Sequence, residues 1–199
     1  MQVDFYQLGS TPLEQVIASI AQKLVGEDKR LLIVAGDEGA LGRLDRMLWI
    51  PTGKPDYRKP PVASVSDRLA MLALATKDQP DYEVDRRELE ASASPYTVDT
   101  LKALRAERPQ DELYLLLGGD QYASLRRWRE PDEVRRLAKL AVFARPGYEA
   151  SDEGVKVIPM QPMAVSASDI RARAARGEPL EGLVPRAVAN YIADNRLYR

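Results

Sequence analysis

Apolar residues recur along this chain with two alternating periods, one typical of helices and one typical of strands. Apolar positions three and four residues apart predict helices over 11–24, 37–49, 66–77 and 97–105. Short apolar runs between them predict strands over 3–8, 31–35, 82–84, 112–117, 140–144 and 155–158, and the runs at 112–117 and 140–144 are typical of strands covered on both faces. Because strands and helices alternate, we expect an α/β fold with a doubly wound parallel sheet.

Two of these patterns meet abruptly in the run LWIPTGKP, residues 48–55. The helix predicted to end at Trp49 runs straight into Ile50-Pro51-Thr52-Gly53, a phrase typical of the end of a strand. A packed junction at this place should bury most of the Trp49 ring.

Composition narrows the classes of function. The 199 residues carry a formal net charge of −1, so no electrostatic footprint for nucleic acid or for an anionic membrane is expected. The chain has no cysteine, which excludes disulfides and thiolate metal sites, and no histidine, so its chemistry must proceed without imidazole. With no signal peptide and no long apolar span, we expect one cytoplasmic globular protein.

Ligands of doubly wound sheets bind beyond the carboxyl ends of the strands, and one stretch there contains paired glycines. Gly118, Gly119 and Asp120 follow an apolar strand and would let backbone and a carboxylate approach a ligand, with Trp128 close behind. The alternative interpretation is an ordinary glycine turn with a capping aspartate and a half-buried tryptophan.

Two further stretches open predicted helices. Tyr96 and Thr97 could hold a planar polar ring, although helix capping explains them equally well. Ser166, Ser168 and Arg171 combine hydroxyls, helix amides and a guanidinium, which suits a phosphate. A capped surface helix with a solvated arginine is the alternative here.

Taken in order, the motifs of residues 50–199 resemble bacterial nicotinate-nucleotide adenylyltransferases, which join ATP to nicotinate mononucleotide and release pyrophosphate. The resemblance implies a Rossmann-like nucleotidyltransferase of NAD biosynthesis, with ATP as substrate and Mg²⁺ accompanying it. It further implies that Tyr96, Thr97, Asp120 and Trp128 contact the nicotinate nucleotide, and that Ser166, Ser168 and Arg171 hold the ATP phosphates. The motifs that carry it are IPTGKP (50–55), DRLAML (67–72), VDRREL (84–89), PYTVDT (95–100), GGD (118–120) through Trp128, ARPG (144–147), VSASDIR (165–171), LVP (183–185) and LYR (197–199).

The chain departs from that family at the phosphate-binding motif. The family's GGTFDPxHxGH turn, whose histidines and amides cradle the triphosphate, is absent, and its PPHK phrase reads Pro55-Asp56-Tyr57-Arg58-Lys59. Lys54, Arg58 and Lys59, together with the backbone at Gly118 and Gly119, are auxiliary candidates for the site, and no protein metal-ligand set is identified. We therefore expect weak or absent turnover, because each preorganised donor of this type contributes ~10²- to 10³-fold to rate.

Residues 1–49 instead resemble the start of the chi subunit of bacterial DNA polymerase III, through VDFY (3–6) and LDRMLW (44–49). The chain thus resembles a chimera, with the chi-like segment expected to join the same sheet. An alternative function is therefore a replication interaction module that docks on a replisome protein. A third alternative is an adenylyltransferase scaffold that binds no ligand. The choice between nicotinate and nicotinamide nucleotide and the oligomeric state stay open at this point.

Overall fold

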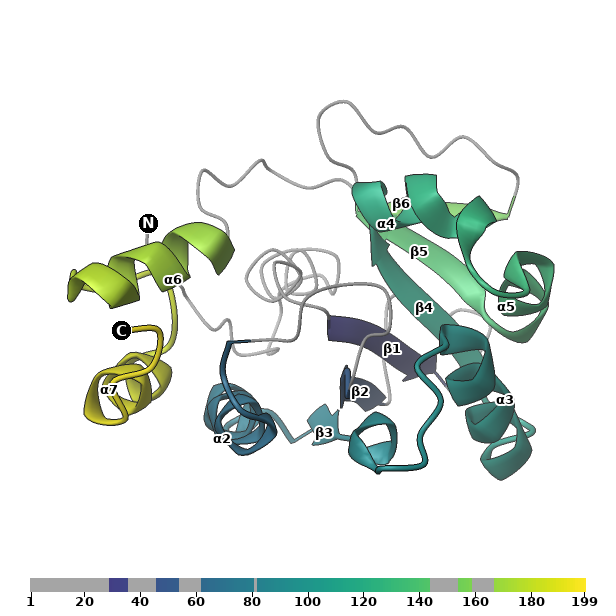
Figure 1. Cartoon of the computed structure of the whole chain (residues 1–199). Helices are drawn as coiled ribbons and strands as arrows, with labels where there is room; N and C mark the ends of the chain where they lie inside the picture. The colour runs from purple at the N-terminus through teal and green to yellow at the C-terminus, as the bar shows by residue number, and fades with distance from the viewer. Residues whose placement is uncertain (1–28, 36–45, 54–61, 81, 144–153, 159–166) are drawn as a thin grey trace.

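The computed structural model describes residues 29–35, 46–53, 62–80, 82–143, 154–158 and 167–199 (Figure 1). The strand predicted over 3–8 and the helix predicted over 11–24 lie outside them. The described residues form a six-stranded sheet in the order β3-β2-β1-β4-β5-β6, which is the strand order of doubly wound sheets that bind dinucleotides. The strands are β1 Lys29–Ala35, β2 Arg46–Pro51, β3 Tyr82–Val84, β4 Glu112–Gly118, β5 Lys139–Phe143 and β6 Val155–Ile158.

The direction of β1 departs from the expected parallel sheet. The pairs β2–β3, β4–β5 and β5–β6 are parallel as predicted, whereas β1 runs antiparallel to both β2 and β4. All strands except β1 therefore share one direction, and their carboxyl ends lie at one edge of the sheet, which we call the carboxyl edge. An antiparallel neighbour needs no helical crossover, so the short connection over 36–45 suffices to join β1 to β2.

The predicted helix over 37–49 is wrong at its end, because residues 46–49 belong to β2. Met47, Leu48, Trp49 and Ile50 are all buried, so the strand is covered on both faces at these four apolar positions, whereas Arg46 at its start is exposed. Trp49 is 2% exposed, and its ring centroid lies 5.5 Å from that of Tyr82. The sheet is continuous across residue 50.

The helices form two groups (Figure 1). One core joins α3 and α5 to inward-facing residues of the strands, including Leu101, Leu115 and Leu140. A second cluster joins α2, α6 and α7 through residues such as Met71, Ala174 and Ile192. The helices are α2 Val65–Thr76, α3 Thr97–Glu107, α4 Gly119–Ser124, α5 Pro131–Leu137, α6 Ala167–Arg176 and α7 Arg186–Asp194, with 3₁₀ turns η2 Arg87–Leu89 and η3 Leu125–Arg127.

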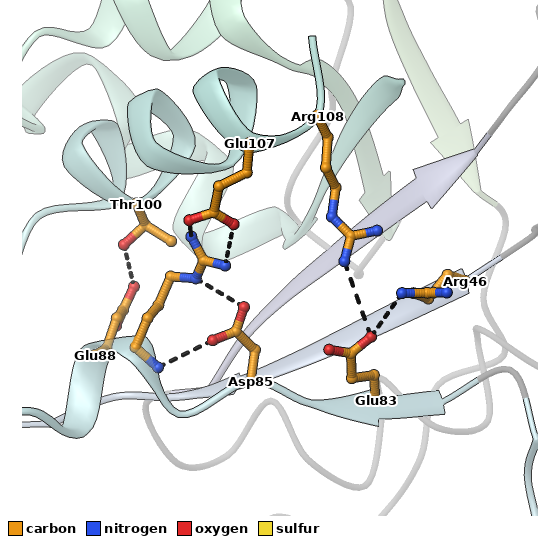
Figure 2. Close-up of polar contacts among 8 residues, drawn as sticks. Arg46, Glu83, Asp85, Glu88, Thr100, Glu107 and Arg108 are labelled. Carbon is orange, nitrogen blue, oxygen red and sulfur yellow. Dashed lines mark hydrogen bonds and ion pairs between the residues drawn. The ribbon is translucent and has the colours of Figure 1, made fainter. Parts of the chain in front are cut away.

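Thr52 and Gly53, which follow β2, lie against Arg68 of α2 and Glu88 of η2. The Arg68 guanidinium, 4% exposed, donates a 2.7 Å hydrogen bond from Nη1 to the carbonyl of Thr52. At Gly53 a Cβ atom would lie 2.1 Å from the carbonyl oxygen of Glu88, so only glycine fits there. The Glu88 side chain in turn accepts a 2.7 Å hydrogen bond from the Thr100 hydroxyl (Figure 2).

Ion pairs of Arg87 join the residues after β3 to α3 (Figure 2). Arg87 donates to both Glu107 oxygens, at 3.0 and 2.8 Å, and its Nε donates to Asp85 at 2.7 Å. The bond from Arg87 lowers the pKa of the Glu107 carboxyl below its ordinary value. These contacts join the end of β3 to the last turn of α3 and thereby orient that helix on the sheet.

Within the described ranges, no helix is long and apolar enough to cross a membrane.

Candidate active site at the carboxyl edge of the sheet

Two glycines, Gly118 and Gly119, lie where β4 ends at the carboxyl edge. β4 is buried from Leu113 to Gly118, and Gly118 is the N-cap of the short helix α4. Gly119 is buried at the first position of α4, and Asp120 is half-buried in its first turn. The two glycines leave the strand end without side chains, and the approach of a ligand to them stays a prediction.

Tyr96 and Thr97 open α3 at the same edge. Tyr96 is the N-cap, but its side chain makes no capping hydrogen bond, and Thr97 is buried. Ser94 supplies the local polar contacts instead, because its hydroxyl accepts the Tyr96 N–H at 3.3 Å and donates to Asp99 at 2.5 Å. Capping therefore does not account for the Tyr96 ring.

Trp128 packs on the same core as this tyrosine. The two rings are partly buried and pack, with Tyr122, against the cluster that joins α3, β4 and α5. The Trp128 indole donates from Nε1 to the Ser124 hydroxyl at 3.3 Å, and its backbone N–H bonds to the carbonyl of Leu125 at 3.0 Å. Tyr96 and Trp128 thus pack on one core, and their contact with a nucleotide stays a prediction.

One residue of this region was not predicted from the sequence. The Arg129 guanidinium carbon lies 4.7 Å from the centroid of the Tyr96 ring, which is within cation–π range. The only sequence signal is that Arg129 directly follows Trp128, and no periodicity relates it to Tyr96.

The expected phosphate residues lie on another helix. Ser168 is exposed in the first turn of α6, and its hydroxyl accepts a 3.0 Å hydrogen bond from Arg171 Nη2. This helix packs with α2 and α7, and Figure 1 shows it at the left of the view, apart from α4. Ser166, Lys54, Arg58 and Lys59 lie outside the described residues.

The described residues contain no cluster of three or more acidic side chains placed to hold a metal ion.

Comparison with protein families places two models on the chain. The cytidylyltransferase-like model matches residues 31–173, and the model of the DNA polymerase III chi subunit, HolC, matches residues 1–54. The two matches overlap over 31–54, a range that contains β1 and β2.

Curated relatives and solved structures agree on the first of these families. A probable nicotinate-nucleotide adenylyltransferase of Frankia casuarinae is 39% identical over 177 residues, covering 84% of this chain and 92% of that relative. The corresponding protein of Streptomyces coelicolor is 35% identical over 174 residues, covering 84% of this chain and 93% of that relative.

Among solved structures, the Plasmodium falciparum nicotinic acid mononucleotide adenylyltransferase complexed with NaAD shares the fold, with a TM-score of 0.64 and 15% identity over 80% of this chain and 85% of that one. A nicotinate-nucleotide adenylyltransferase structure from Vibrio parahaemolyticus gives a TM-score of 0.58 at 14% identity, covering 78% of this chain and 80% of that one. The fold is therefore the Rossmann-like nucleotidyltransferase fold expected from the motifs. With relatives this similar over nearly their whole length, the chain belongs to the nicotinate-nucleotide adenylyltransferase family.

Proposed function

We propose that this protein binds nicotinate mononucleotide at the carboxyl edge and joins it to the adenylyl group of ATP, forming deamido-NAD and pyrophosphate in NAD biosynthesis. The observation that supports the proposal most directly is the packing of Tyr96 and Trp128 on one core beside the glycine-lined end of β4. Two partly buried aromatic rings on the core that β4 shares suit a flat pyridine ring carried on a ribose phosphate.

Each candidate residue has a role in this reaction. Tyr96 and Trp128 hold the pyridine ring, and Thr97 and Asp120 supply polar groups to its substituent and to the ribose. A phosphate oxygen of the mononucleotide attacks the α-phosphorus of ATP, a new P–O bond forms, and the bond to the departing pyrophosphate breaks. Magnesium enters with ATP as part of that substrate.

In this proposal the residues of α6 bind the triphosphate of ATP. Ser168 and Arg171 already form a hydroxyl–guanidinium pair at 3.0 Å, and Ser166 precedes them at the entry to the helix. Lys54, Arg58 and Lys59 add positive charge from the segment after β2. Flexible lysines act as point charges and do not replace a fixed set of histidine and amide donors.

Turnover with ATP is expected to be slow. The chain has no histidine, so the histidine cradle of the family is missing. The reversed β1 adds a second reason, because the connection that leaves this central strand starts at the edge opposite the carboxyl edge.

The test is magnesium-dependent release of pyrophosphate from ATP and nicotinate mononucleotide, measured beside the Frankia casuarinae relative. The Ser166→Ala, Arg171→Ala double variant serves as the blank. We expect turnover above that blank but at least ~10²-fold below the relative, since each lost donor of this type costs ~10²- to 10³-fold. A rate equal to the relative's would refute the slow turnover, and a folded protein no faster than the blank would refute catalysis.

The family match over residues 1–54 favours a second candidate, a replication interaction module. In that case the segment before β1 would dock on a replisome protein such as a single-stranded-DNA-binding protein. Direct binding of that protein to the full chain, compared with a chain that lacks residues 1–28, tests it. Equal binding by both chains would exclude this function for the leading segment.

A further inference from the structure

Glu88 contacts two separate elements, one through its side chain and one through its backbone. The side chain is 5% exposed, and its Oε1 accepts a 2.7 Å hydrogen bond from the Thr100 hydroxyl of α3 (Figure 2). Its carbonyl oxygen lies so close to Gly53 that a Cβ atom there would come within 2.1 Å of it. One residue of η2 therefore touches both α3 and the backbone that follows β2.

The bond from Thr100 ties the first turn of α3 to another part of the chain. Tyr96, the N-cap, makes no side-chain capping bond, and the Ser94 hydroxyl accepts its N–H at 3.3 Å. That contact is local and does not fix where the turn lies on the molecule. The Thr100 bond does, because Glu88 belongs to η2. Tyr96 and Thr97 stand one helical turn before Thr100, so whatever holds Thr100 also holds them.

The same short segment holds the other end of α3. Arg87, next to Glu88, donates to both oxygens of Glu107 at 3.0 and 2.8 Å, and Glu107 is the last residue of the helix. Glu88 and Arg87 thus hold the first and the last turn of α3. A tilt or a shift of the helix along the sheet would break one of these contacts.

We propose that Glu88 and Thr100 are positioning residues of the nucleotide site, because their hydrogen bond determines where Tyr96 and Thr97 lie at the carboxyl edge. This inference rests on the proposed function, in which Tyr96 and Thr97 contact nicotinate mononucleotide. The side chains of Glu88 and Thr100 are buried and point toward each other, so they act through α3 (Figure 2). Groups that bind a ligand must be held within about 0.5 Å of the productive geometry, which buried supporting contacts of this kind provide.

Equilibrium binding tests the proposal without requiring turnover. Nicotinate mononucleotide and, separately, ATP with magnesium are titrated by calorimetry into the full chain and its variants. Thr100→Val removes the hydroxyl and keeps the shape of the side chain, whereas Thr100→Ser keeps the hydroxyl. Thr76→Val is the matched control, because Thr76 is also buried and its hydroxyl donates a 2.9 Å bond to the Leu72 carbonyl within α2. Urea unfolding measures the stability of each protein.

Thr100→Val should weaken the binding of nicotinate mononucleotide roughly three- to tenfold, since one buried hydrogen bond limits the effect to about this size. Its affinity for ATP should not change, because the proposed function assigns that ligand to α6. Thr100→Ser should restore the affinity for the mononucleotide. Thr76→Val should lower the urea midpoint about as much as Thr100→Val does and leave both affinities unchanged, which separates positioning from stability.

Two results would overturn the inference. If Thr100→Val leaves the affinity for the mononucleotide unchanged, or weakens both ligands equally, the bond does not position this subsite although the subsite exists. If the unmodified protein does not bind the mononucleotide, the proposed function fails and this inference fails with it. The unmodified protein alone distinguishes the two failures.

A second variant covers the case in which Thr100→Val does not fold. Thr100→Ala also lacks the hydroxyl but places no methyl group against the Glu88 carboxyl, and the same weakening is expected of it. If neither variant folds, the bond serves folding and the inference is overturned.

Discussion

Gly53 stands where the segment after β2 touches the backbone of η2. A Cβ there would lie 2.1 Å from the Glu88 carbonyl oxygen, which is backbone and cannot rotate away. Gly53→Ala should therefore destabilise the protein by about 1–3 kcal/mol, the usual cost of overpacking. The measurement is the midpoint of urea unfolding, and an unchanged or higher midpoint would contradict the close approach.

Arg68 is a structural residue although it is charged. Replacing it with methionine keeps most of the side-chain volume but leaves the Thr52 carbonyl without the 2.7 Å bond from Nη1. We expect a loss of about 1.5–3 kcal/mol, typical of a hydrogen bond to a charged group. Lys77→Met, at the exposed end of the same helix, is the control and should have little effect. Equal effects of the two changes would argue against the buried bond.

At the scale of single residues, the sequence indicated the aromatic pair but not its charged neighbour. Tyr96 and Trp128 are recognisable because each belongs to a motif with family-specific order. Arg129 is not, because its contact with Tyr96 depends on how the turn before α5 is placed against α3. Such contacts between distant segments leave no local pattern.

Among the helices, α7 contacts α2 through the polar pair Tyr191 and Asp67. The Tyr191 hydroxyl donates to Asp67 Oδ1 at 3.0 Å, and Ser64 donates to Oδ2 at 2.6 Å. The bonds from Ser64 and then Tyr191 lower the pKa of Asp67 below 3.8, and the bond to Asp67 raises the pKa of Tyr191 above 10.0. The contact therefore stabilises the fold between these two pH values.

Tyr191→Phe tests that window. A carboxyl with a depressed pKa contributes fully above its unfolded value and loses the contribution as pH falls through the folded pKa. A phenol with a raised pKa loses its contribution as pH rises through the folded value. The stability difference between the two proteins should be largest near neutral pH and shrink below about pH 3.8 and above about pH 10.0. Urea midpoints across this range measure it, and a constant difference would rule out the ionic contribution.

Element boundaries followed from the sequence where the period was unambiguous. The strands at 82–84 and 155–158 were predicted at their observed bounds. Residues 46–49 were not, because Leu44, Met47 and Leu48 fit a helical face, while a strand buried on both faces is apolar at every position. Only pairing with β1 and β3 decides between these two patterns.

For the whole molecule, β1 is the element on which the sheet depends. It lies between β2 and β4, so a chain that begins at Arg46 would leave both of those strands with unpaired edges. We expect that fragment to lack a cooperative unfolding transition and native near-ultraviolet circular dichroism. A chain that begins at Lys29 is the control, because it retains every described strand. Cooperative unfolding of the shorter fragment would show that residues 46–199 form an independent unit.

The doubly wound architecture was accessible from the sequence, and the direction of β1 was not. Alternating elements predict a doubly wound sheet, and the observed order agrees. The pattern of side chains along a strand is the same in either direction, however, so the reversal of β1 leaves no trace in its residues. The proposed boundary between the segments 1–49 and 50–199 stays a prediction, and β2 runs through it without a break.

The reversal of β1 also determines where the preceding chain is tethered. Lys29 pairs with Pro51 at the end of β2, and Leu31 pairs with Leu116 near the end of β4. The chain thus enters the sheet at the carboxyl edge, where we propose that the nucleotide binds. A fluorophore attached just before Lys29 would lie close to a nucleotide bound at this edge. A bulky fusion at the same point would hinder binding of that nucleotide.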